Sequence, residues 1–118
     1  MRACCISQRY SSSATEPPSL PSSIALSTAL EYAAKGIRVN AVCPGTIDTA
    51  FSRAVVNWDE QKFEALVKAP PIGRAGKPEE IASVVLWLCS PGASYVVGHA
   101  LAVDGGLAVA NLGLRVLG

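Results

Sequence analysis

The residues best suited to hold a ligand form one short run, residues 44–49 (PGTIDT), directly after a segment with the pattern of an apolar strand. In open α/β sheets, ligands bind beyond the carboxyl ends of the strands. Gly45 allows the backbone to approach a ligand closely, and Pro44 fixes the direction in which the chain leaves the strand. This run therefore predicts a binding turn. The alternative is a turn that only ends a strand.

Other side chains with catalytic potential lack the partners that their chemistry needs. A lysine four residues after a tyrosine shares its helix face and lowers the phenol pKa, so that the phenol can exchange a proton. None of the three tyrosines has this spacing, because the residues four positions later are Ala14, Gly36 and His99. His99 is the only histidine, and no second group is indicated for base or metal chemistry. We expect a structural role for it and no catalytic residue in this chain.

The cysteines give no indication of a metal site. Cys4, Cys5, Cys43 and Cys89 form no CxxC pair and no Cys/His cluster with zinc spacing. They predict buried or incidental thiols in a reducing, cytoplasmic compartment. An exposed reactive pair of Cys4 and Cys5 is the alternative, although nothing nearby in the sequence would lower a thiol pKa.

Length and composition indicate one small, apolar domain. The chain has 118 residues, of which 50% are hydrophobic and 16% charged, and its formal net charge is +1. The apolar excess indicates missing neighbours or an oligomer. The near-neutral charge does not favour a nucleic-acid partner or an anionic membrane surface. No apolar run approaches the roughly 20 residues of a membrane span, and the first residues lack the apolar region of a secretory signal.

The elements that must position the turn alternate between helix and strand. A strand over residues 37–43, apolar on both faces, is typical of the interior of a parallel sheet. A second strand at residues 99–103 would complete a right-handed parallel βαβ unit, which places the chain in the α/β class. Before the first strand, apolar residues at helical spacing predict a helix that Gly36 ends. They are Leu26, Ala29, Leu30, Ala33 and Ala34.

Two helices are expected between the strands. The first spans residues 59–68, with Asp59 as its N-cap and Phe63, Leu66 and Val67 as its apolar stripe. The second begins at Pro78, where two glutamates suit the positive end of the helix dipole. Its inward face consists of Ile81, Val84, Val85 and Leu88.

Residues 1–23 differ in composition from the rest of the chain. They are rich in serine and proline, which predicts a disordered or unrelated leader. The packed region is expected at residues 24–112, followed by a tail at 113–118. From the abrupt boundary near Ile24 we expect a fragment, such as a truncated gene, a shifted reading frame or a mispredicted start would produce.

Three strings in order carry a resemblance to a known family. They are residues 36–45 (GIRVNAVCPG), 73–82 (GRAGKPEEIA) and 98–106 (GHALAVDGG). With this order and spacing, the chain resembles the C-terminal part of a short-chain dehydrogenase/reductase. The resemblance covers about residues 24–110. It implies the last two strands, with flanking helices, of a Rossmann-like doubly wound parallel sheet.

The resemblance also implies NAD or NADP as cofactor and alcohol or carbonyl substrates, 3-oxoacyl compounds among them. The Ile47 backbone would hydrogen-bond the nicotinamide carboxamide, and the Thr49 hydroxyl would help to hold the carboxamide or the pyrophosphate. Pro44 and Gly45 would line the ring. The helix at residues 59–68 would belong to a segment that covers the substrate. Three aromatic residues would line a pocket there or, alternatively, pack the segment onto the body: Phe51, Trp58 and Phe63.

Two motifs of that family are absent from these residues. The sequence contains neither Gly-x-x-x-Gly-x-Gly, whose backbone N–H groups hold the pyrophosphate, nor Tyr-x-x-x-Lys. We therefore expect no catalysis by this chain alone.

Two alternatives remain open for the chain. It could be an association module, because the last long helix and strand commonly form a subunit interface in the family. Leu86, Trp87 and the apolar tail at residues 107–117 would contribute to that interface. It could also fail to fold stably, because two strands without the central sheet leave an open edge.

Overall fold

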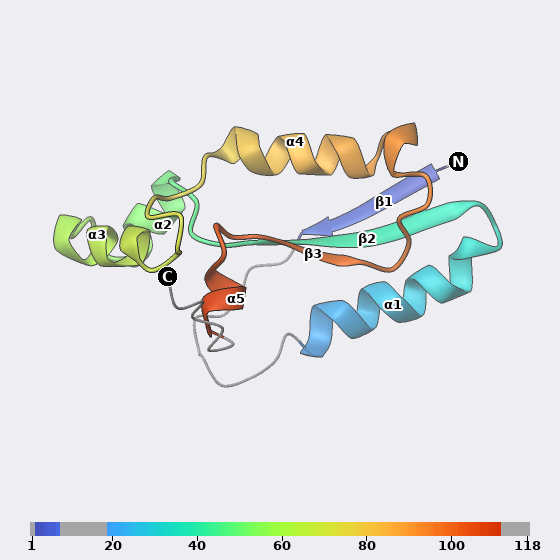
Figure 1. Cartoon of the computed structure of the whole chain (residues 1–118), viewed down its shortest axis with the longest axis horizontal. Coiled ribbons are helices and arrows are strands. Elements are labelled where there is room, and N and C mark those ends of the chain that lie inside the picture. The colour runs from blue at the N-terminus through green and yellow to red at the C-terminus, as the bar shows by residue number, and fades with distance from the viewer. Residues whose placement is uncertain (1, 8–18, 112–118) are drawn as a thin grey trace, which may run out of the picture.

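A parallel sheet between two helical layers forms the body of the molecule. The computed structural model describes residues 2–7 and 19–111, with side chains described for residues 26–110. Helices α1 (Ser19–Ala33) and α4 (Pro78–Leu88) lie on opposite faces of the sheet (Figure 1). This arrangement confirms the predicted α/β class. No helix in the described part of the chain combines the length and the apolar character needed to cross a bilayer.

β2 (Ile37–Pro44) is the central strand of the sheet. The described strands follow the order β1-β2-β3, and both pairings are parallel. β1 (Arg2–Ser7) pairs with most of the length of β2, whereas β3 (Ala100–Val103) pairs only with its second half, from Ala41 onward. The predicted parallel pairing of the two later strands is confirmed.

The N-terminal residues differ from the expectation of a disordered leader. No strand or helix is expected before Ile24, yet β1 spans Arg2–Ser7 and α1 begins at Ser19. The edge of β2 offers a row of backbone N–H and C=O groups that an extended segment can satisfy, and β1 covers the edge that was expected to stay open. Pro21 lies in the first turn of α1, where its missing N–H removes no intrahelical hydrogen bond. The division into a leader at 1–23, a family region at 24–112 and a tail at 113–118 stays a prediction.

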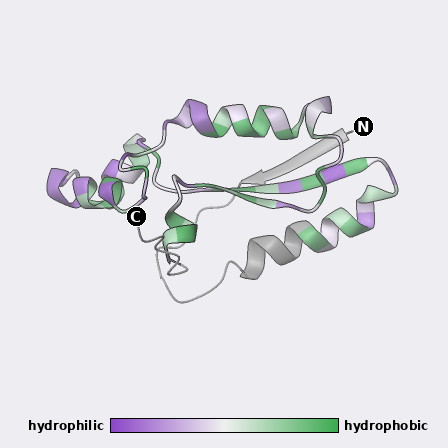
Figure 2. Cartoon of the chain, in the orientation of Figure 1, coloured by the Kyte–Doolittle hydropathy of each residue, from purple (hydrophilic) through white to green (hydrophobic). Residues whose placement is uncertain are grey.

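The core lies between β2 and α4. Leu88, Val42 and Ala93 are fully buried, and the α4 residues Ile81, Val84 and Val85 pack against them. The predicted inward face of α4 is therefore confirmed. Figure 2 shows α4 hydrophilic at its start and hydrophobic over much of its remaining length. Because strand side chains alternate between faces, the neighbours of Val42 in β2 face α1, which buries Ala29.

Two polar residues interrupt the apolar character expected for β2. Arg38 and Asn40 retain only 4% and 1% of their exposure. The Arg38 guanidinium donates to the Ser90 and Val96 carbonyls at 3.3 and 3.4 Å. The Asn40 amide donates to the Val96 carbonyl at 3.0 Å. Ser90 follows the C-terminus of α4, where the helix dipole favours a cation, so Arg38 ties this helix end to the central strand.

Shorter elements complete the described fold. α3 (Glu60–Lys68) has the predicted N-cap, because the Asp59 carboxylate accepts hydrogen bonds from two N–H groups of the first turn at 3.0 and 3.2 Å. The structure also contains three elements that the sequence patterns did not indicate. They are α2 (Ala50–Val55), the 3-10 helix at Pro91–Ala93 and α5 (Leu107–Asn111). Each is too short to show a clear hydrophobic period.

The burial of α4 predicts different effects for two leucines two residues apart. Leu88→Ala should lower the free energy of unfolding by about 2–5 kcal/mol, because it leaves a cavity in the core. Leu86 is 71% exposed, so Leu86→Ala should change that free energy by at most about 0.5 kcal/mol. Urea unfolding of both variants provides the measurement. Equal losses would contradict this assignment of the inward face.

Candidate functional site

The candidate site is the turn at residues 44–49, which follows the carboxyl end of β2. The Gly45 N–H donates to the Val103 carbonyl at 3.0 Å, so the turn starts against the end of β3. A Cβ atom on Gly45 would lie 2.7 Å from both Cα and Cβ of Asp104. Only glycine fits this approach. The close approach at Gly45 is to Asp104 at the end of β3, and the predicted approach to a ligand stays a prediction.

A second backbone segment, residues 72–76, runs beside the turn; we call it the strap. Gly76 donates its N–H to the Thr46 carbonyl, and its own carbonyl accepts from the Asp48 N–H, both at 2.9 Å. A Cβ on Gly76 would lie 2.7 Å from Cδ1 of Ile47. This parallel bridge uses the backbone groups of the residues on either side of Ile47. Because successive residues of an extended chain direct their groups to opposite sides, the N–H and C=O of Ile47 face away from the strap.

Thr49 ends the turn and begins α2. Its hydroxyl accepts from the Ser52 N–H at 3.2 Å, and its own N–H donates to the Ser52 hydroxyl at 3.0 Å, which completes a capping box. This pairing satisfies two groups that a helix start would otherwise leave without partners. The structure therefore gives the Thr49 hydroxyl a structural partner at the place where a cofactor contact is expected.

Arg53 connects the turn to the segment that follows it. Its guanidinium donates two hydrogen bonds to the Asp48 carboxylate, at 2.9 and 3.1 Å, and one to Glu60 at 3.2 Å. It also stacks over the Phe63 ring, 4.3 Å from the centroid. The hydrogen bond from Arg53 holds the pKa of Asp48 below its ordinary value. One cation thus joins the turn, α2 and α3.

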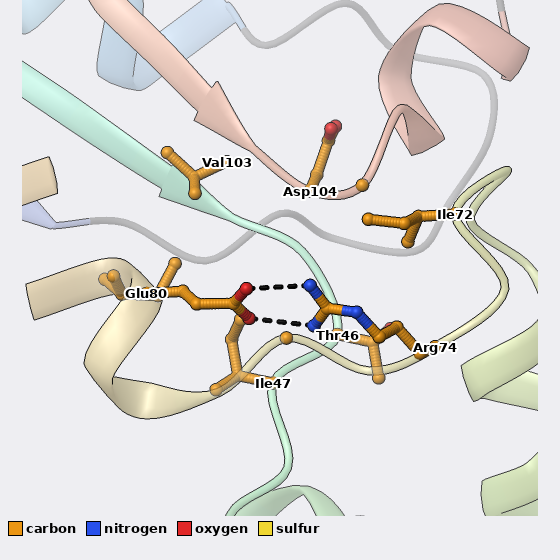
Figure 3. A pocket seen from close by; sticks show the side chains of 10 residues that line it. Thr46, Ile47, Ile72, Arg74, Glu80, Val103 and Asp104 are labelled. Atoms are coloured by element: carbon orange, nitrogen blue, oxygen red, sulfur yellow. Dashed lines mark hydrogen bonds and ion pairs between the residues drawn. The ribbon is translucent and has the colours of Figure 1, made fainter. Parts of the chain in front are cut away.

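Arg74 and Glu80 form the other ion pair at the site. The guanidinium donates two parallel hydrogen bonds to the Glu80 carboxylate, at 2.7 and 2.9 Å (Figure 3). The same carboxylate accepts from the Lys77 N–H at 2.8 Å, in the first turn of α4. Hydrogen bonds from Arg74 and from the Lys77 backbone lower the pKa of Glu80 to about 2. Glu80 is therefore ionised across the ordinary pH range.

A cavity of about 200 Å³ lies between the turn, the strap, the start of α4 and the end of β3. Its walls are mainly apolar, with Ile72, Ile81 and Val103 among them, and the Arg74–Glu80 pair closes one side (Figure 3). Small-molecule sites usually measure about 300–1,000 Å³, so this volume is too small for a dinucleotide. The Asp104 carboxylate beside it accepts from the N–H groups of Gly106 and Ala108, and thus caps the start of α5.

The three aromatic residues proposed for the substrate cover differ in burial. Phe63 is buried under Arg53, which favours the packing alternative for this residue. Phe51 and Trp58 are exposed. Trp58 and Asn57 both have positive φ, 59° and 54°, in the tight connection between α2 and α3.

The thiol of Cys43 is not an activated nucleophile. Cys43 is buried in β2, and burial followed by the nearby Asp104 charge raises its pKa. Cys89 is exposed. The side chains of Cys4 and Cys5 lie outside the described residues. Within the described ranges, no group of three or more His, Cys, Asp or Glu side chains is arranged to hold a metal ion.

Four charged residues around the site escaped the sequence interpretation: Arg53, Arg74, Glu80 and Asp104. Glu80 was assigned only a helix-dipole role, and its pairing with Arg74 has no helical spacing to reveal it. One signal in the sequence could have indicated this pair. Arg74 and Glu80 are six residues apart on either side of Gly-Lys-Pro, and such residues favour a turn that reverses the chain direction.

Comparison with known proteins identifies relatives of most of this chain. A family model described as enoyl-(acyl carrier protein) reductase matches residues 22–108. A tropinone reductase homolog of Arabidopsis thaliana is 44% identical over 86 residues, which covers 73% of this chain and 32% of that relative. The galactitol 2-dehydrogenase (L-tagatose-forming) of Cereibacter sphaeroides is 47% identical over 81 residues, which covers 69% of this chain and 32% of that relative. The chain spans about a third of the length of these curated relatives.

Solved structures agree with the sequence relatives. The ligand-free aldohexose dehydrogenase of Thermoplasma acidophilum superposes with a TM-score of 0.75 at 33% identity, over 92% of this chain and 49% of that one. A putative 2-deoxy-D-gluconate 3-dehydrogenase of Agrobacterium tumefaciens, solved with bound NADP, superposes with a TM-score of 0.73 at 32% identity. The match covers 92% of this chain and 48% of that one.

The Arg53–Asp48 contact predicts a pH-dependent contribution to stability. The folded pKa of Asp48 is lowered, so its contribution is present above the unfolded value and is lost as the pH falls through the folded one. Arg53→Gln should return the Asp48 pKa towards its ordinary 3.8 and remove this contribution. Carboxyl-carbon NMR titration measures the pKa. Lys68→Gln, which removes a separate ion pair on α3, is the matched control and should leave the Asp48 pKa unchanged. An unchanged Asp48 pKa in Arg53→Gln would refute the contact.

Proposed function

We infer the function of this chain from its family: it belongs to the short-chain dehydrogenase/reductases. We propose that the turn at residues 44–49 binds the nicotinamide end of NAD or NADP. The parent reaction would be hydride transfer between the nicotinamide and the carbon of an alcohol or carbonyl substrate, with 3-oxoacyl compounds among the candidates.

The orientation of the Ile47 backbone is the observation that carries this proposal. The bridge to Gly76 occupies Thr46 and Asp48 and leaves the N–H and C=O of Ile47 on the opposite side. A primary carboxamide has one acceptor and two donors, so it complements an adjacent N–H and C=O. The turn also lies beyond the carboxyl end of a parallel strand, where ligands of open α/β sheets bind.

The neighbouring residues suit the same ligand. Gly45 admits the Asp104 backbone where a side chain would otherwise stand, which keeps the turn beside Pro44 against the end of β3. Thr49 would contribute through the remaining lone pair of its hydroxyl, or after releasing Ser52. We therefore propose Pro44, Gly45, Ile47 and Thr49 as the cofactor-binding residues of this chain.

Catalysis by these residues alone is not part of the proposal. A bound reduced cofactor would supply the hydride, and the substrate oxygen would need a proton from an acid. The sequence has no Tyr-x-x-x-Lys pair to provide that acid and no Gly-x-x-x-Gly-x-Gly loop to hold the pyrophosphate. In this proposal the chain orients the nicotinamide, and other residues hold the phosphates and transfer the proton. A reducing, cytoplasmic location would suit the buried thiol of Cys43.

Two measurements on the purified chain test this function. With NADH or NADPH and a panel of ketones and 3-oxoacyl thioesters, we expect no turnover above background. In amide NMR, nicotinamide mononucleotide should shift the Ile47 resonance with millimolar affinity, because only the nicotinamide end is recognised. Ribose 5-phosphate is the control and should leave the Ile47 amide resonance unshifted. Turnover would contradict the first expectation, and an Ile47 resonance indifferent to nicotinamide mononucleotide would contradict the second.

A self-association role is the second candidate, and the exposed side of α4 favours it. Leu86 is 71% exposed and Trp87 48%, although both belong to a helix whose other face packs against the core. Adjacent large apolar side chains on a surface are typical of protein interfaces. A second copy of this chain is the partner that the proposal names.

Sedimentation velocity checks the association. The chain should sediment as a dimer, and the double variant Leu86→Ser/Trp87→Ser should sediment as a monomer with an unchanged circular dichroism spectrum. Tyr95→Ser, at a fully exposed residue outside the helix, should leave the dimer intact. A monomeric wild-type chain at about 100 μM would rule the role out, because specific dimers of standard interface size usually form below that concentration.

A further inference from the structure

We propose that Arg74 and Glu80 are positioning residues that brace the strap and thereby hold the Ile47 backbone in its binding orientation. The inference rests on the proposed function for its consequence, cofactor binding. Its structural part, the bracing of the turn, stands on the described contacts alone.

The first step is the rigid support that α4 gives to Glu80. Glu80 lies in the first turn of α4, and the same helix buries Leu88 in the core. Its carboxylate is already oriented by the Lys77 N–H. Glu80 therefore presents a fixed, ionised acceptor to any cation in front of the helix. Arg74 fills that place with two parallel hydrogen bonds, a geometry that restricts both side chains more than a single contact does.

The second step is the path of the strap. At its beginning, the Ile72 N–H donates to the Gly105 carbonyl at 3.2 Å, and at its end Gly76 makes the bridge to the turn. Arg74 lies midway between these two attachments. Among the described residues, its side chain reaches Glu80 and the neighbouring Ala75 carbonyl. The ion pair thus connects the middle of the strap to α4.

The third step links the strap to the ligand-binding backbone. Gly76 contributes both of the hydrogen bonds that hold Thr46 and Asp48. Ile47 lies between these two residues, so its N–H and C=O keep their direction only while Gly76 stays in register. Figure 3 shows Arg74 and Glu80 directed towards each other, with Thr46 and Ile47 beside them. Loss of the pair would free the strap to move and would let the turn rotate.

Exposed ion pairs often contribute little, so the alternative is a surface contact without consequence. The chain offers a matched pair for comparison, Glu64 with Lys68 on α3. Both pairs are partly exposed, and in both the cation lowers the pKa of the glutamate. Only Arg74 belongs to a segment that bridges the turn.

Amide hydrogen exchange in the full 118-residue chain tests the brace. Arg74→Met keeps Glu80 and its bond to Lys77, so it removes the ion pair without removing the helix cap. We expect the amides of Asp48 and Gly76 to exchange about fivefold faster, because local opening of a bridge governs their protection. The Ala41 amide, bonded to the His99 carbonyl within the sheet, should keep its rate. Glu80→Gln should act like Arg74→Met, and Glu64→Gln should change none of these amides.

Binding supplies the second measurement. Arg74→Met should weaken the affinity for nicotinamide mononucleotide, measured from the shift of the Ile47 amide resonance, at least about threefold. It should not lower the melting temperature. Arg74→Lys should give an intermediate affinity, because it keeps the charge but not the paired geometry. Unchanged amide exchange rates at Asp48 and Gly76 in both Arg74→Met and Glu80→Gln would overturn the brace, whether or not nicotinamide mononucleotide binds. Faster exchange at these amides in a chain whose Ile47 never responds to nicotinamide mononucleotide would support the brace and reject the proposed function instead.

Discussion

β2 is buried on both of its faces and has a parallel strand on each edge, and this constraint determines where α1, α4, β1 and β3 can lie. α4 covers the face that carries Val42, and α1 covers the opposite face. β1 and β3 satisfy its two rows of backbone groups. A central strand enclosed in this way leaves only its two ends open. The chain emerges from the carboxyl end into the turn at residues 44–49, so the candidate site starts from the end of the central strand.

The polar contacts extend this order beyond the sheet. Arg38 and Asn40 reach from β2 to the carbonyls that follow α4 and thereby set the position of the loop leading into β3. At the other end of α4, Glu80 holds Arg74 and the strap. The helix is therefore tied to the sheet at its C-terminus and to the candidate site at its N-terminus. Buried guanidinium groups are tolerated where carbonyls and a helix dipole compensate their charge, and Arg38 has both.

The site uses backbone geometry more than side-chain chemistry. Gly45 and Gly76 each stand where a Cβ atom would lie less than 3 Å from a neighbour, so two segments can approach the turn closely. Side-chain charges act around it: Arg53 joins the turn to α3, and Arg74 joins the strap to α4. This division explains why the chain retains a candidate nicotinamide-binding turn without a tyrosine–lysine pair. Orientation of a carboxamide needs amide and carbonyl groups, whereas proton transfer needs a titratable side chain.

Sequence patterns alone determined the α/β class, the central strand, the inward face of α4, the Asp59 cap and the glycine-containing turn. Each depends on local properties: periodic burial, a side chain that bonds its own helix start, or a residue without a Cβ atom. The same reasoning missed β1, because a Ser/Pro-rich composition describes its neighbourhood and not the free strand edge that it pairs with. It also missed the contacts of Arg38 with Ser90, Ile47 with Gly76 and Arg74 with Glu80. These contacts join segments without a shared period, so only the packing of the helices on β2 could bring them together.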